Sequence, residues 1–189
     1  MTEEEQINII NSTISKTREN LRPLSFNLIF WGVMINLMSI FHYFFESVFE
    51  YSRYSIILYW TILPLIGMVF TIRWNIKRGI KKGYETVLDR TIKIIWAVFG
   101  LGWLIILISS IIVGQSPVPL ILFLLGLVLV MNGLIIKFKP ITIGGIILFI
   151  FVFYLFIDPS INYLVVNMIG VTLGMFIPGL LLNRMKSSG

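Results

Sequence analysis

The sequence predicts an all-α, polytopic membrane protein in which an N-terminal amphipathic helix precedes six transmembrane helices, paired as three antiparallel hairpins. Hydrophobic residues make up 57% of the 189 residues and charged residues only 13%, a balance far from that of a soluble domain. Six apolar stretches have the length of a membrane span, and the basic residues fall in alternate connections. Cysteine is absent, which excludes disulfides and thiolate chemistry.

The first element expected is a cytosolic amphipathic helix over Glu3–Asn20, within a leading segment 1–23. Thr2 to Glu5 fits a capping box, in which a hydroxyl and a carboxylate bind the free amides of the first turn. An acidic start is unlike a signal peptide, so we expect the first span to be retained. Apolar residues then recur near coiled-coil spacing and form a narrow stripe that needs a partner: Ile7, Ile10, Ile14 and Leu21.

The transmembrane domain is expected over residues 24–186. A bilayer core about 30 Å thick requires roughly 20 apolar residues in a helix. The connections within the last four spans are short, so these spans are expected to pack as antiparallel neighbours. The six predicted spans are Leu24–Phe45, Ser55–Trp74, Ile92–Val113, Val118–Ile136, Ile141–Ile157 and Ile161–Leu182.

The distribution of basic residues predicts that both termini lie in the cytosol, because lysine and arginine near spans are held on that side. Of the 15 basic residues, 14 lie before the first span, in the second and fourth connections or after the sixth span. Only Arg53 lies on the other side. The net charge of +6 therefore reports topology, and it does not indicate nucleic-acid binding, because no recognisable nucleic-acid-binding fold accompanies it.

The second connection carries the densest basic cluster. Apolar residues from Ile76 to Leu88 also recur there near helical spacing, which favours a helix on the membrane surface whose basic side chains contact anionic headgroups. The alternative is a surface that docks the N-terminal helix or another protein. The basic residues concerned are Arg73, Lys77, Arg78, Lys81 and Lys82.

Three uncharged polar residues within the spans require an explanation: Asn36, Asn132 and Asn167. An amide in hydrocarbon is costly without a hydrogen-bond partner, so each is expected to face the bundle interior. The favoured interpretation is adhesion between helices, and the alternative is a solute pathway lined by these amides.

A candidate metal site follows the first span. His42, Glu46 and Glu50 recur at intervals of four residues, so they share a face if the helix continues, and imidazole with carboxylates can hold a divalent metal. Solvated side chains at a span end are the simpler explanation. The many aromatic residues nearby indicate an interfacial belt.

Two functions remain open from the sequence. The chain has one histidine, no cysteine and no acid within a span core, so we expect neither an enzyme nor a cofactor. We favour a scaffold or regulatory subunit that contacts a protein partner through its cytosolic helix and basic loop. The alternative is a small-solute transporter or channel, as a homodimer, with an asparagine-lined pathway.

The stretch from Phe26 through Trp31 and Gly32 resembles the first span of small, uncharacterised multi-span membrane proteins of bacteria. The six-span plan is also similar to that of bacterial acid-stress membrane proteins. These resemblances imply a bacterial inner membrane as the location, and they imply no functional residue.

Overall fold

The computed structural model describes residue 6 and residues 21–50, 52–158 and 160–184. In this part of the chain six helices are long and apolar enough to cross a membrane, and every other described element is also helical, which confirms the predicted all-α class with six spans. The pairing of the spans as three hairpins stays a prediction. Apart from Gln6, the predicted N-terminal helix lies outside the described residues. The side chains of Glu50, Arg53, Lys81 and Lys82 also lie outside this description.

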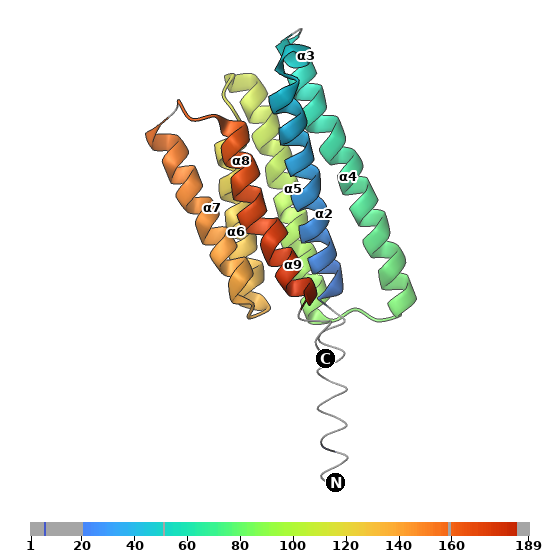
Figure 1. The fold of residues 1–189 in the computed structure, drawn as a ribbon. Coiled ribbons are helices and arrows are strands. Elements are labelled where there is room, and N and C mark those ends of the chain that lie inside the picture. The colour runs from blue at the N-terminus through green and yellow to red at the C-terminus, as the bar shows by residue number, and fades with distance from the viewer. Residues whose placement is uncertain (1–5, 7–20, 51, 159, 185–189) are drawn as a thin grey trace.

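The spans follow one another in chain order, joined by short connections (Figure 1). Gly83 and Gly114 end two of the long helices with φ of 74° and 75°, in the left-handed region that glycine tolerates best. Thr86 begins a helix through a reciprocal capping box with Asp89. The elements are α2 (Arg22–Phe44), α3 (Glu46–Glu50), α4 (Arg53–Lys82), α5 (Val87–Val113), α6 (Val118–Ile135), α7 (Lys139–Ile157), α8 (Tyr163–Val171), η1 (Thr172–Phe176) and α9 (Ile177–Arg184), the last three forming one span.

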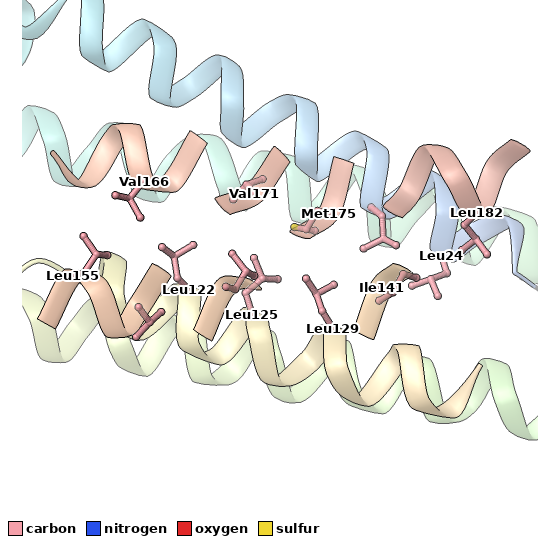
Figure 2. Packing of buried hydrophobic residues seen from close by; sticks show 13 residues of the cluster. Leu24, Leu122, Leu125, Leu129, Ile141, Leu155, Val166, Val171, Met175 and Leu182 are labelled. Atoms are coloured by element: carbon pink, nitrogen blue, oxygen red, sulfur yellow. The ribbon is translucent and has the colours of Figure 1, made fainter. Parts of the chain in front are cut away.

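The tightly packed part of the molecule consists of α2, α6, α7 and the composite span α8–η1–α9. The helices α6 and α7 lie against each other along their length, and α2 lies against all three parts of the composite span. Side chains from α6 and α7 point toward those from α8, η1 and α9 (Figure 2). The most buried of them include Leu122, Leu129, Ile141, Leu148 and Val171.

Glycines allow the helices of this core to approach closely. A Cβ added at Gly144 of α7 would lie 2.7 Å from the carbonyl oxygen of Gly174 in η1. Pro178 has no N–H to donate to that oxygen, and the N–H of Ile177 bonds instead to Thr172, which gives the π-helical turn.

The second connection differs from the surface helix expected there. The helix α4 continues without a break to Lys82, and the connection is reduced to residues 83–86 before α5 begins at Val87. Ile76 and Ile80 therefore belong to a spanning helix, while Leu88 belongs to the next one. The reason is local: Gly79 keeps a helical conformation within α4, whereas Gly83 adopts the left-handed conformation that ends the helix.

The helix α4 lies outside the tight core, and α5 lies at its edge, where Ile92, Trp96 and Phe99 pack against the core cluster. Within the described residues, α4 packs against α2 and α3, and α5 packs against α6, but no comparable contact joins α4 to α5. Figure 1 shows α4 standing beside α2 on the side away from α7. We call the end of the bundle with Arg22, Arg78, Lys139 and Arg184 the basic end, and the end with His42, Gln115 and Asn162 the far end.

Candidate functional site

The separation of α4 from α5 leaves a cleft of about 2110 Å³. Residues of α4 and α5 form its sides, and residues of α2, α6, α8 and η1 form its inner wall. It extends from Arg22 and Arg78 at the basic end to His42 and Gln115 at the far end. The volume is about twice the upper limit for a typical small-molecule pocket, which runs to roughly 1,000 Å³. A cleft of this extent suits a long ligand.

The cleft exists because bulky side chains keep α4 away from the core. Phe26 of α2 stacks against Trp74 of α4 with ring centroids 4.0 Å apart, and Phe30 of α2 packs at a tilt against Phe70 of α4 with centroids 5.2 Å apart. The glycine of α4 that faces α2, Gly67, meets the flexible side chain of Met34 and no backbone atom. Large rings at the contact hold the helix axes apart, whereas the glycines of the core bring them together.

The middle of the cleft is apolar. A ligand at this depth meets methylene, methyl and aromatic groups, which interact well with hydrocarbon chains. The lining residues there include Pro64, Met68, Ala97, Leu104 and Leu125.

The basic end of the cleft carries amide and charged groups. Asn75 of α4 donates to the side-chain oxygen of Asn27 of α2 over 3.4 Å. Lys93 forms an ion pair with Glu85 at 2.6 Å, and Asp89 accepts hydrogen bonds from the backbone and hydroxyl of Thr86. Both lining acids at this end therefore have partners.

The remaining cations of the basic cluster lie along the last turns of α4. The guanidinium of Arg78 lies 5.0 Å from the ring centre of Trp74, a cation–π arrangement, and Arg78 lines the cleft. Arg73 and Lys77 are exposed and do not line it. Lys81 and Lys82 were predicted with this cluster, and their side chains lie outside the described residues.

At the far end, two hydrogen bonds tie α4 to α2. Trp60 donates its indole N–H to Nδ1 of His42 over 3.0 Å, and the Tyr59 hydroxyl donates to the Met38 carbonyl over 3.0 Å. His42 also packs against Phe49, with ring centroids 4.4 Å apart. His42 is thus an acceptor that helps position α4.

The structure does not bring together three metal ligands within the residues that it describes. His42 and Glu46 both line the cleft, but the Glu50 side chain lies outside the description, so the predicted trio stays a prediction.

Asp158 accepts hydrogen bonds from the N–H and hydroxyl of Ser160. Both hydrogen bonds stabilise the carboxylate and lower the pKa of Asp158 below its ordinary value, and the bond from the Ser160 hydroxyl has the larger effect.

Two of the three asparagines form hydrogen bonds between helices. Asn167 donates to the Ser39 hydroxyl over 3.0 Å, and Asn36 accepts from the Thr172 hydroxyl over 3.2 Å. Both bonds join α2 to the last span. Asn167 also lines the cleft, while Asn36 does not.

Asn132 behaves differently. It is fully buried and donates to the Val128 carbonyl of its own helix over 2.8 Å, and its Oδ1 has no partner among the described residues. It does not line the cleft either. The three asparagines therefore do not line one common pathway.

Apart from Arg78, the residues of α4 and α5 that line the cleft were not identified as site residues from the sequence. Trp31, Trp60, Trp96 and Trp103 all line the cleft, and the indole N–H of Trp96 is buried with no partner among the described residues. An apolar wall inside a cleft has the same composition as a wall facing lipid. Only the presence of tryptophan on several spans hinted at a shared surface.

No protein-family model matches this chain, and no curated protein or solved structure matches it.

Proposed function

We propose that this is a non-enzymatic integral membrane protein that takes up a lipid-like amphiphile from the bilayer into the cleft between α4 and α5. The observation that carries the proposal is the cleft itself, about 2110 Å³ in volume, apolar in its middle and polar at both ends. A molecule with a hydrocarbon chain and a polar headgroup has the same succession of chemistry. The lack of close contact between α4 and α5 in the described residues gives an acyl chain a lateral way in.

A small neutral solute is less well supported as the ligand. The predicted alternative was a pathway that reaches Asn36, Asn132 or Asn167, and of these only Asn167 lines the cleft, where its amide donates to the Ser39 hydroxyl. The apolar middle of the cleft would also leave a polar solute without hydrogen-bond partners.

The proposal is tested by filling the cleft. Ala97 lines it, so Ala97→Trp adds a large side chain into the cleft space. The neighbouring Val98 is 57% exposed and does not line the cleft, so Val98→Trp is the matched control. Native mass spectrometry of the full-length protein released from detergent micelles should show retained lipid in the wild type and Val98→Trp, and its loss in Ala97→Trp. Equal lipid retention in all three proteins would contradict the proposal.

A second candidate is the scaffold or regulatory role, in which the basic end of α4 contacts a protein partner. The observation in its favour is the length of α4, since 30 residues span about 45 Å against a hydrocarbon core of about 30 Å. Its basic last turns, with exposed Arg73 and Lys77, then lie at the level of the headgroups or beyond.

That candidate predicts that Arg73→Glu with Lys77→Glu abolishes co-purification of a defined partner, while Lys137→Glu with Lys139→Glu, at the same end of the bundle, has no effect. Unchanged or equally reduced co-purification in both variants would count against it.

We also propose that the basic end faces the cytosol of a bacterial inner membrane, because basic flanks are retained on that side.

A further inference from the structure

We propose that the cleft binds its amphiphile in one orientation, with a net-negative, phosphate-bearing lipid headgroup against Arg22, Asn27 and Asn75 at the basic end. This inference rests on the proposed function and adds the class of headgroup and the direction in which the lipid lies.

The charges that line the two ends of the cleft differ in sign. Three basic side chains and two acidic ones line the basic end, a formal balance of 3 − 2 = +1, from Arg22, Arg78, Lys93, Glu85 and Asp89. At the far end the lining charge is the carboxylate of Glu46, beside His42. An anionic headgroup is thus attracted to one end and repelled from the other.

Arg22 is the cation at the basic end that is available to a ligand. It is exposed at the first position of α2 and makes no hydrogen bond or ion pair with any residue that the structure describes. Lys93, by contrast, is paired with Glu85. A guanidinium presents five donors in a planar fork, which matches the oxygens of a phosphate group.

Two amides complete the set of donors. Asn27 lies five residues after Arg22 on α2, and Asn75 meets it from α4. Their mutual hydrogen bond uses one of the four amide hydrogens, so the others can bind phosphate or glycerol oxygens. At a rise of 1.5 Å per residue these amides lie about 7.5 Å deeper than Arg22 along the helix.

The depth of these groups fits the position of a lipid headgroup. The 23 residues of α2 extend about 35 Å, slightly more than the hydrocarbon core of about 30 Å. Arg22 at the start of α2 is therefore at headgroup level, and the apolar middle of the cleft begins below the amides. A lipid held there keeps its chain beside Met68 and Ala97.

The test is the headgroup preference of the retained lipid. Full-length protein is reconstituted with equal amounts of phosphatidylglycerol and phosphatidylcholine, extracted, and examined by native mass spectrometry. We expect the wild type to retain phosphatidylglycerol in about tenfold preference, because this lipid is net negative, whereas the choline cation of phosphatidylcholine cancels its phosphate charge and is repelled by Arg22. Arg22→Gln should remove most of this preference.

Two further variants distinguish binding inside the cleft from a general effect of charge at the basic end. Arg73→Gln removes an equal charge from the same end but outside the cleft, so it should leave the preference unchanged. Asn75→Leu removes the donors of an amide that lines the cleft. Asn75 does not border the second groove, on the other face of α2 and α4, which Arg22 also borders. This variant should lower the amount of phosphatidylglycerol retained. No preference in the wild type, equal effects of Arg22→Gln and Arg73→Gln, or no effect of Asn75→Leu would each overturn the inference.

Failure of the proposed function gives a separate result. If Ala97→Trp retains as much lipid as the wild type, the bound lipid is not in the cleft, and both proposals fall. If Ala97→Trp loses lipid but the wild type retains both headgroups equally, only the orientation inferred here is wrong.

Discussion

The indole N–H of Trp60 on α4 donates to Nδ1 of His42 on α2 over 3.0 Å, and this contact holds the far ends of the two helices together. With the bond from Tyr59 to Met38 and that from Asn75 to Asn27, it is one of three hydrogen bonds between α2 and α4 in the described part of the chain. Aromatic stacking supplies the rest of the contact. The width of the cleft therefore depends on few polar contacts.

The Trp60 to His42 bond gives the first prediction. Trp60→Phe removes the donor and keeps an aromatic ring, at a cost of about 0.5–1.5 kcal/mol for one hydrogen bond. We expect a broader distance distribution between spin labels at the exposed positions Tyr43 and Leu58, measured by pulsed electron paramagnetic resonance. The control Trp74→Phe changes the same residue type at the other end of α4 and should leave this distribution narrow. If the distance distribution of Trp60→Phe were identical to that of the wild type, the hydrogen bond from Trp60 to His42 would not hold the two helices together.

Close packing in the core gives the second prediction. A Cβ at Gly144 would lie 2.7 Å from a backbone oxygen of η1, which cannot move aside as a side chain can. Gly144→Ala should destabilise the protein by about 1–3 kcal/mol, the usual cost of overpacking. Gly79→Ala is the control, since no atom lies within 4 Å of the added carbon, and it should be neutral or slightly stabilising. Thermal unfolding in detergent checks both, and equal midpoints would contradict the packing.

The interhelical amide gives the third prediction. Asn167 and Ser39 are joined at 3.0 Å, so the double-mutant cycle of Asn167→Ala and Ser39→Ala should yield a coupling free energy of about 0.6 kcal/mol, with an upper value of about 1.7 kcal/mol. Asn167→Ala and Asn132→Ala should be additive, because the two residues share no hydrogen-bond partner. Unfolding by denaturant in mixed micelles measures each corner of the cycle. A coupling of zero for the first pair would remove adhesion as the role of Asn167.

The proposed topology gives the fourth prediction. The chain contains no cysteine, so single cysteines report accessibility without background. Lys139→Cys at the basic end should resist a membrane-impermeant maleimide in intact cells, and Ser116→Cys in the connection between α5 and α6 should be labelled, because basic flanks remain in the cytosol. Permeabilised cells provide the control in which both positions react. The reverse pattern in intact cells would place the basic end outside.

Asp158 gives the fifth prediction. Its carboxylate accepts from the Ser160 hydroxyl at 2.6 Å and from the Ser160 N–H at 3.0 Å, and its pKa lies below the ordinary value of 3.8. A lowered pKa in the folded state means that the stabilising effect is present above the unfolded pKa and is lost as the pH falls through the folded pKa. The connection between α7 and α8 should therefore be insensitive to pH near neutrality. Ser160→Ala should raise the pKa of Asp158 in a carboxyl-carbon NMR titration; an unchanged pKa would rule out the hydroxyl as the cause.

The sequence was sufficient for the class of fold because the bilayer imposes a length and a composition on each span. The fourth span illustrates this: Val118–Ile136 was expected from hydropathy, and α6 covers Val118–Ile135. The end of the second span was harder to place. Basic residues after Trp74 indicated a connection, but charge does not break a helix, and α4 continued until Gly83 adopted a left-handed conformation.

The candidate site was much less visible in the sequence. His42 was noted as a metal ligand, whereas its partner in the structure is Trp60 from another span. Asn167 was noted as adhesive, but nothing in its neighbourhood along the chain indicated Ser39 as its partner. Contacts between residues 18 and 128 positions apart depend on which helix faces are adjacent, and apolar spans are too uniform to reveal this.

The sequence by itself determined the number of spans and roughly where each lies, because burying a helical backbone in lipid requires long apolar stretches whatever the neighbouring helices do. The tertiary structure alone decided which spans pack and which stand apart. Gly144 against Gly174 brings two helices close, and Phe26 against Trp74 keeps two others at a distance. Glycines and rings occur in both kinds of span, so only their alignment in space creates the cleft.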